Sequence, residues 1–279
     1  MSKPNVHQKT ILNLLSDPKA DFLIPDYQRP YAWNQDQCQT LWDDLVNFTV
    51  PGGNHEKFDS KKDEYFLGSI VAFQENDKHE IIDGQQRLTT FMLILRAFHK
   101  EFENRQDNDG INIRKNIEKC IWKYDEFENP LKDELKITSE VAGDDDKDEF
   151  LSILKNGDAP KEYKSQYAEN FRFFENKIRE MRNYNSSNNQ YIVTRLLKNC
   201  AILFVEAETQ DSALRIFSTL NDRGLPLADA DIFKSKFYKL YSDKNQKNDF
   251  IKEWKNNFKQ WIFKFNWFNK GRLGTRSIN

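Results

Sequence analysis

The stretch from Tyr65 to Phe102 constrains the fold of this chain more than any other part of the sequence. Two apolar runs, at 65–73 and 80–82, have the composition and short period typical of strands. After Asp83 and Gly84 the apolar residues recur with a period of about 3.6, which predicts that a helix starts there. A strand, a tight turn and a helix in this order indicate an α+β fold.

The predicted helix has one apolar face and gathers polar residues at its start. The apolar face consists of Leu88, Phe91, Met92, Leu95, Phe98 and Phe102. The polar residues are Asp83, Gln85, Gln86, Arg87 and Thr89. Free backbone N–H groups and the positive end of the helix dipole favour an anion at such a place. Arg87 adds a fork of donors that matches phosphate oxygens, so the helix start is a candidate anion site.

The same residues also fit a capping box. In that interpretation the Asp83 side chain accepts a hydrogen bond from the N–H of Gln86, and the Gln86 side chain reaches back. Asp83 would then shape the helix start and take no part in chemistry. Both interpretations stay open on the sequence alone.

A second candidate segment follows a short predicted strand at Phe22–Ile24. Two prolines, Pro25 and Pro30, stiffen the loop that follows and fix the direction of Gln28 and Arg29. This is typical of a positioned binding loop. The loop could equally be a turn whose aromatic residues cover the core.

A third candidate segment follows a buried strand predicted at 200–205. The helix after that strand ends in an elbow at 220–227, whose glycine and proline are those of an ordinary helix end. Such an end does not require the polar residues Asn221 and Arg223. We therefore include them in the candidate site.

The chain divides into four predicted parts. They are 1–105 as the first part of an α+β domain, 106–198 as a helical insertion, 199–243 as the part that completes the domain, and 244–279 as the start of a further helical region. Residues 5–16 are predicted to form a short helix. The ending does not resemble a domain edge, so we expect the sequence to stop short of a further domain.

The segment 252–276 combines basic and aromatic residues. It holds seven basic residues and one acidic residue, interleaved with tryptophan and phenylalanine. Proteins that bind single-stranded nucleic acid use this combination. The helical spacing of Trp254, Phe258 and Trp261 also predicts a face for docking another domain, and we favour that interpretation.

Composition excludes several classes of protein. Lys and Arg total 42 against 44 Asp and Glu, so the formal net charge of -2 gives no overall attraction to nucleic acid. Three well-separated cysteines without C-x-x-C spacing predict buried thiols and a cytoplasmic location. No apolar run approaches the roughly 18 residues of a membrane helix. The sequence also lacks metal-ligand spacing of its histidines, a Walker-type loop and a His-Asn-His nuclease cluster.

Four motifs in fixed order resemble the N-terminal domain family of GmrSD-type modification-dependent restriction enzymes, which is related to the ParB and sulfiredoxin fold. The motifs are Ile24–Trp33, Tyr65–Ile70, Asp83–Thr90 and Phe217–Gly224, and the resemblance covers about residues 10–240. It implies a small mixed sheet of the ParB/sulfiredoxin type with a largely helical second part. Sulfiredoxin chemistry itself is excluded, because Gln85 and Gln86 stand where the reactive cysteine would belong.

The resemblance also implies an activity and its residues. The domain would bind or hydrolyse a nucleoside triphosphate with a divalent cation, Mg²⁺ or Ca²⁺, and so control DNA cleavage in anti-phage defence. The catalytic residues would be Asp83, Gln86 and Arg87, with Asp83 also the metal ligand. The phosphate-binding residues would be Gln28, Arg29, Gly84, Gln85, Thr89, Asn221 and Arg223.

The resemblance implies the partners as well. In the restriction enzymes that this chain resembles, a His-Asn-His nuclease follows the domain or is a partner protein, so an HNH-type nuclease domain or subunit and DNA, including modified phage DNA, are expected partners. Because this sequence has no such cluster, it should not cut DNA alone. A homo-oligomer is left open. The alternative is a non-hydrolytic DNA-binding or protein-docking module, in which Arg29, Arg87 and Arg223 meet DNA phosphates.

Overall fold

The computed structural model describes residues 4–141 and 144–221, with side chains as far as Phe217. The strands are β1 (Asn5–Thr10), β2 (Phe22–Ile24), β3 (Tyr65–Glu75), β4 (Lys78–Asp83), β5 (Trp122–Tyr124), β6 (Pro130–Leu135), β7 (Ile137–Ser139) and β8 (Cys200–Ala207). The helices are α1 (Ile11–Leu15), α2 (Gln35–Thr49), α3 (Gln85–Phe102), α4 (Asn108–Ile121), α5 (Lys147–Asn156), α6 (Gln166–Tyr184), α7 (Asn188–Asn199) and α8 (Gln210–Asn221). Two short 3-10 turns, Pro51–Gly53 and His55–Lys57, follow α2.

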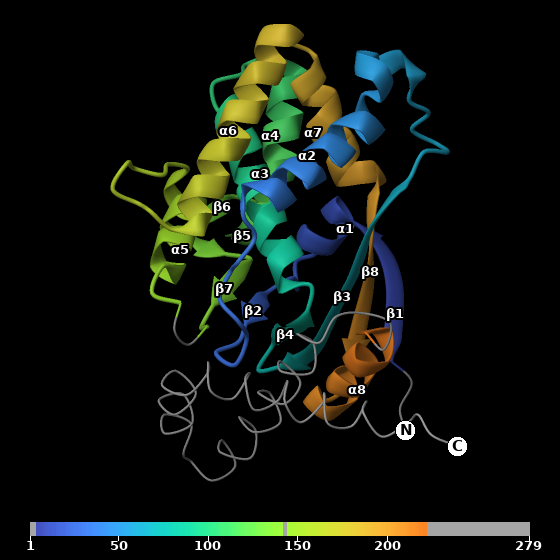
Figure 1. Ribbon diagram of the computed structural model, residues 1–279, viewed down its shortest axis with the longest axis vertical. Helices are drawn as coiled ribbons and strands as arrows, with labels where there is room; N and C mark the ends of the chain where they lie inside the picture. The colour runs from blue at the N-terminus through green and yellow to red at the C-terminus, as the bar shows by residue number, and fades with distance from the viewer. Residues whose placement is uncertain (1–3, 142–143, 222–279) are drawn as a thin grey trace, which may run out of the picture.

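A mixed six-stranded sheet carries the fold. Its order is β1-β8-β3-β4-β2-β7, while β5 and β6 form a separate hairpin. The pairs β1/β8 and β3/β4 are antiparallel, and β8/β3, β4/β2 and β2/β7 are parallel. The helices α2, α3, α4, α6 and α7 stand together at one end of the sheet and α8 lies at the other (Figure 1). The predicted α+β class is confirmed.

The central helix α3 is buried all round. Fifteen of its 18 residues are buried. The six residues of the predicted apolar face are among them, as expected, but burial extends round the helix beyond that face. Polar side chains such as Thr90 escape the usual penalty of burial because they find internal hydrogen-bond partners. The first turn of α3 emerges where β4 ends, beside the loop that follows β2.

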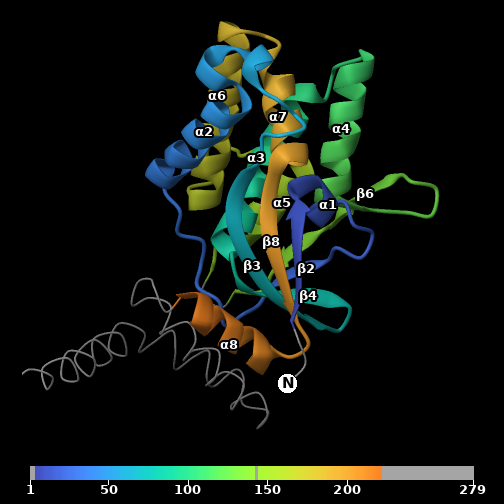
Figure 2. The same cartoon turned by 90° about the vertical axis from the view of Figure 1, so that its right-hand side faces the viewer.

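The two faces of the sheet are covered by different helices. Alternate residues of β3, such as Ile70 and Ala72, pack into the large core under the helical bundle. Val71 and Phe73 point the other way and pack against Leu214 of α8. In Figure 2, α8 crosses the end of the strands, where it contacts β3, β4 and β8.

The prediction of a helix over 5–16 is wrong in its first half. Asn5–Thr10 forms β1, which pairs with β8 along its whole length at the edge of the sheet. Its first four residues are exposed. They therefore lack the alternation of apolar and polar residues by which a half-buried strand can be recognised in a sequence. The helix proper is α1, which Thr10 caps by accepting the N–H of Asn13 at 3.1 Å.

The segment predicted as a helical insertion does more than supply helices. Residues 106–198 contain α4 to α7, but also β5, β6 and the sheet strand β7. The bounds of the four predicted parts and the likeness to ParB and sulfiredoxin stay predictions, and 252–276 lies outside the described residues. All three cysteines are buried and free, as expected. In the described ranges no helix is long and apolar enough to cross a bilayer.

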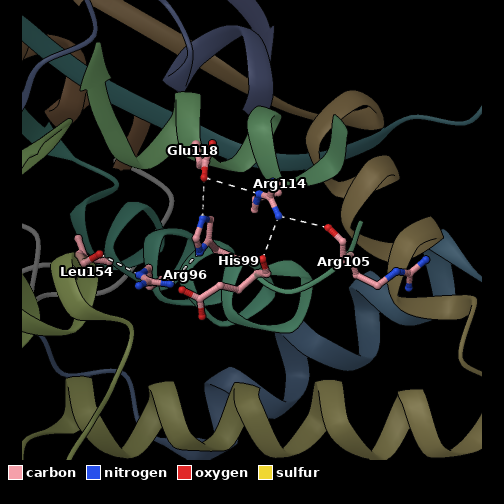
Figure 3. Close-up of polar contacts among 7 residues, drawn as sticks. Arg96, His99, Arg105, Arg114, Glu118 and Leu154 are labelled. Carbon is pink, nitrogen blue, oxygen red and sulfur yellow. Dashed lines mark hydrogen bonds and ion pairs between the residues drawn. The ribbon is translucent and has the colours of Figure 1, made fainter. Parts of the chain in front are cut away.

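A buried chain of polar side chains fixes the C-terminal half of α3 to its neighbours (Figure 3). The Arg96 guanidinium, only 4% exposed, donates from Nε to the carbonyl of Leu154 in α5 and from Nη1 to His99 Nδ1, at 2.9 and 3.0 Å. His99 Nε2 lies 3.1 Å from Oε1 of Glu118 in α4. Arg114, also in α4, places its Nε 3.9 Å from the same oxygen. Three helices are therefore joined through one imidazole.

These contacts fix which ring nitrogen of His99 carries the proton. Arginine can only donate, so Nδ1 must accept and the proton lies on Nε2, which donates it to Glu118. Burial lowers the pKa of His99 below its ordinary 6.5; the Glu118 hydrogen bond opposes this shift, and the charge of Arg96 adds to it. The ring is therefore neutral in the folded protein at neutral pH.

We predict that His99 lowers the stability of the protein as the pH falls below 6.5, the ordinary pKa of histidine, while Glu80, whose pKa burial raises to about 7, contributes in the opposite direction. Unfolded His99 takes up a proton there while the folded ring resists it, so the loss continues until the pH reaches the lowered folded pKa. His99→Gln, which keeps an acceptor for Arg96 and a donor for Glu118, should show a smaller decline. Urea unfolding between about pH 7.5 and 5 measures this.

The exposed residue His7 gives a matched control for this prediction. His7→Gln should retain the pH dependence of the wild type. Identical pH slopes in the wild type and His99→Gln would contradict the assigned role of His99.

Candidate functional site

The turn between β4 and α3 forms the floor of the candidate site. Gly84 has a φ of 90° and takes the N-cap position without a side-chain cap bond. A Cβ at this position would lie 2.8 Å from Ile70 Cγ1 and 3.0 Å from the Ser69 carbonyl oxygen, so only glycine fits. The predicted capping box is wrong, because Asp83 ends β4 and the Gln86 side chain points to a different loop.

Gln86 ties the loop after β2 to the start of α3. Its Oε1 accepts the N–H of Ala32 at 2.8 Å, and its Nε2 donates to the Pro30 carbonyl at 3.2 Å. The side chain is 7% exposed. Both ends of the amide are therefore satisfied within the fold.

Gln28 and Gln85 form a second brace between the same elements. Gln28 Nε2 donates to the carbonyls of Ile81 and Ile82 at 3.0 and 2.9 Å. Gln85 Nε2 donates to Gln28 Oε1 at 2.8 Å. The glutamines that the sequence assigned to phosphate binding or catalysis thus hold the loop against β4 and α3.

Arg87 lies across a bulge in β3. The register of β3 against β8 shifts between Phe66 and Ser69, and Gly68 within this bulge has a φ of 105°. Arg87 Nη1 donates to the Ser69 carbonyl at 2.7 Å. In residues 4–141 and 144–217, this is the one hydrogen bond made by the Arg87 side chain. Its remaining N–H groups can bind a ligand.

Asp83 lies near two arginines that come from different segments. Burial raises the pKa of its carboxyl, and Arg87, the backbone N–H of Gly84 and Arg29 oppose that rise. The net direction is upward, so the ionised carboxylate is poorly solvated in this position. A buried carboxylate of this kind gains stability from a bound cation.

These residues enclose a cavity of about 140 Å³, called here the α3 cavity. It is lined by Gln28, Arg29, Trp33, Ile82, Asp83, Gly84, Gln85, Gln86, Arg87 and Phe217. The loop after β2, the β4–α3 turn and α8 each contribute, which are the three segments that the sequence singled out. Seven of the ten predicted site residues meet here.

The other three predicted residues have different outcomes. Thr89 is 2% exposed inside α3 and is not among the residues that line the cavity. Asn221 is the last residue of α8, and its side chain lies outside the described part, as does all of Arg223. Trp33 and Phe217 also line the cavity. Both lie in the motifs quoted above but not among the ten predicted site residues, because aromatic residues in a proline-bounded loop or on a helix equally predict core packing.

A larger, open groove of about 590 Å³ lies where the sheet extends beyond α1. Four of its ionisable groups form two pairs: His79 Nε2 lies 2.9 Å from Glu206 Oε1, and Lys9 Nζ lies 3.7 Å from Asp17 Oδ2. A charged ligand would have to break these pairs. The α3 cavity is therefore the better candidate site despite its smaller volume.

We predict that Gly68→Ala weakens anion binding without removing any charge. An added Cβ would lie 2.6 Å from Arg87 Nη1, so the guanidinium must leave the Ser69 carbonyl. The positive φ adds strain of about 1–3 kcal/mol. Affinity for tripolyphosphate, measured by titration calorimetry, should fall about tenfold, as expected when one charge-assisted hydrogen bond is lost.

Gly53→Ala is the matched control for this change. Gly53 also has a positive φ, of 76°, but the nearest atom to an added Cβ is the Tyr184 hydroxyl oxygen at 3.9 Å. It should lose stability and keep the anion affinity. Unchanged affinity in Gly68→Ala would contradict the placement of Arg87 in the site.

Comparison with known proteins identifies the family. Residues 11–238 match the model of the N-terminal domain of the GmrSD restriction endonuclease. A search of curated proteins gives no significant match. The matched range includes β2, the β4–α3 turn and α8, so it contains the whole α3 cavity. The chain belongs to the family of GmrSD restriction endonuclease N-terminal domains.

Proposed function

We propose that this chain, a component of a restriction system, binds and hydrolyses a nucleoside triphosphate with a divalent cation. In this role it is the regulatory or sensor part that controls DNA cleavage by an HNH-type nuclease. One observation carries the proposal: two arginines and one carboxylate, from the loop after β2 and from the β4–α3 turn, share a small cavity at the start of α3.

The charges in the cavity fit a metal-bound phosphate better than a bare anion. Arg29, Arg87 and the N–H groups at the start of α3 attract phosphate oxygens. Asp83 alone would repel them, unless a cation lies between the carboxylate and the phosphate. Mg²⁺ is commonly bound by one or two carboxylates together with substrate phosphates and water.

The surroundings of Asp83 agree with that kind of metal site. In the described residues no three His, Cys, Asp or Glu side chains converge to hold a metal ion by themselves. A cation at Asp83 would therefore take its other ligands from the nucleotide and from water. Ca²⁺ is an alternative, since it also prefers oxygen ligands.

The site residues then take distinct roles. Arg29 and Arg87 bind phosphate oxygens, and Asp83 holds the cation or orients the attacking water. Gln28, Gln85 and Gln86 act as positioning residues, because their hydrogen bonds keep Arg29 and the helix start in place. Asn221 and Arg223, beyond the described side chains, would close the site from the end of α8.

The direct test measures binding and phosphate release. Wild-type protein should release phosphate from at least one of ATP, GTP, CTP and UTP in the presence of Mg²⁺ or Ca²⁺. Arg87→Met should lose most of this activity and retain its fold, as judged by circular dichroism. Absence of both nucleotide binding and turnover with every metal would refute the proposal.

The alternative, a DNA-binding module without hydrolysis, uses the same arginines. Asp83 lies on the same cavity and would repel a DNA phosphate that brings no metal, which favours the nucleotide. DNA affinity that falls steeply with salt, and that falls further in Arg29→Met and Arg87→Met, would support the alternative.

A further inference from the structure

We infer that Trp33 is the residue on which the nucleobase stacks at the mouth of the α3 cavity. This inference rests on the proposed function and names the part of the nucleotide that the cavity does not enclose. Trp33 lines the cavity beside Arg29 and has one side packed against the main core.

The size of the cavity places the base outside it. Its volume is about 140 Å³, whereas pockets that enclose a drug-sized ligand measure roughly 300–1,000 Å³. The charged groups Arg29, Asp83 and Arg87 all belong to this small space, so phosphates and the cation fill it. The ribose and the base must then extend across the rim.

Among the described aromatic residues that line the cavity, Trp33 is the more exposed one. Phe217, the other aromatic residue lining the cavity, is 6% exposed and is largely covered by its packing in the α8 cluster. Trp33 is only partly buried. A flat indole face that is accessible beside a phosphate site is the kind of group on which bases stack.

The backbone around Trp33 is fixed on both sides. The backbone N–H of the preceding residue, Ala32, donates a hydrogen bond to Gln86 Oε1 at 2.8 Å. The following residue, Asn34, is the N-cap of α2 and forms a capping box with Gln37. The ring is therefore presented on a prearranged backbone, which lowers the entropy lost when a ligand stacks on it.

A buried asparagine from the helical bundle holds Trp33 itself. Asn170 of α6, fully buried, donates from Nδ2 to the Trp33 carbonyl at 2.7 Å and to the Tyr31 hydroxyl at 3.0 Å. Tyr31 is in turn hydrogen-bonded to Thr90 of α3 at 2.8 Å. Asn170 is thus a positioning residue that connects α6 to the mouth of the site.

The test compares a ligand with a base and a ligand without one. Affinities for ATP and for inorganic tripolyphosphate, each with Mg²⁺, are measured by titration calorimetry for wild type, Trp33→Ala and Trp33→Phe. Trp33→Ala should bind ATP roughly 5- to 150-fold more weakly, the range for loss of one base–aromatic stack. Its tripolyphosphate affinity should stay within about twofold, and Trp33→Phe should restore most of the ATP affinity.

A matched control separates stacking from packing. Phe173 of α6 is also partly buried against the main core and does not line the cavity. Phe173→Ala should leave both affinities unchanged. In the wild type, ATP but not tripolyphosphate should quench tryptophan fluorescence, and Trp33→Phe should abolish that quenching, a readout that does not depend on the alanine variant folding.

The outcomes distinguish this inference from the proposed function. If wild type binds tripolyphosphate and ATP equally and Trp33→Ala changes neither, the phosphate site stands and the role of Trp33 is refuted. Equal weakening of both ligands in Trp33→Ala and Trp33→Phe refutes it too, because it shows a structural effect. If wild type binds neither ligand, the proposed function fails, and the inference fails with it.

Discussion

Asp83→Asn should give a more stable protein that no longer turns over nucleotide. Burial raises the pKa of Asp83 above its ordinary 3.8, so the folded protein binds that proton more tightly than the unfolded chain does. The ionised carboxylate therefore lowers stability, and this effect is complete once the pH exceeds the raised pKa. Asparagine keeps the shape of the side chain and removes the charge.

Two measurements check this prediction. The gain in the free energy of unfolding, from urea titrations, should be greatest at neutral pH and should fade as the pH approaches 3.8. Phosphate release with Mg²⁺ should fall on the order of 10²-fold or more, because the variant lacks the carboxylate that we propose holds the cation or orients the water. A residue that lowers stability and supports chemistry is expected at a functional site.

The control for Asp83 is an acid elsewhere on the surface. Asp133 is exposed on β6, and Asp133→Asn should change neither stability nor turnover. A less stable Asp83→Asn protein at neutral pH would contradict the inferred effect of burial. Full turnover in that variant would contradict the role of Asp83 in the site.

Arg96→Met should have the largest effect on stability of the changes predicted here. The variant keeps most of the side-chain length but leaves the Leu154 carbonyl and His99 Nδ1 without their donor. It also removes a positive charge that interacts with Glu103, Glu175 and Glu118. Breaking a buried charged network in this way destabilises by about 3–5 kcal/mol.

Urea unfolding at neutral pH measures this loss, and Arg105→Met is the comparison. Arg105 is 43% exposed at the side chain and pairs with Asp107, so its replacement should change the free energy of unfolding by about 1 kcal/mol at most. A loss below about 1 kcal/mol in Arg96→Met would show that the buried network contributes no more than a surface pair.

Much of the fold could be predicted because its signals are local. The apolar runs that became β3, β4 and β8, and the helical spacing that became α3, lie within single elements. The N-cap Asn34 and its capping box with Gln37 are likewise confined to four neighbouring residues. Short-range patterns of this kind are visible in the sequence without knowledge of the sheet.

The features that were predicted wrongly or not at all depend on distant partners. β1 is a strand only because β8, near the far end of the described chain, pairs with it. α3 is buried on every side because helices from 106–198 surround it. The capping box at Asp83 failed because Gly84 must approach β3 closely and turns through a positive φ, which shifts the helix start by one residue.

The sequence by itself determined that a strand, a glycine turn and a helix bring polar residues together at Asp83–Arg87, and that two other segments could join them. Only the tertiary structure decided what each side chain does. The partners of Gln28, Gln85 and Gln86 lie between 53 and 57 residues away in sequence. An amide engaged with such a distant partner braces the site, whereas Arg87, Arg29 and Asp83 keep charges that face the cavity. A local sequence pattern cannot distinguish a bracing side chain from one that faces the cavity, because the atoms that bond to each side chain lie elsewhere in the sequence.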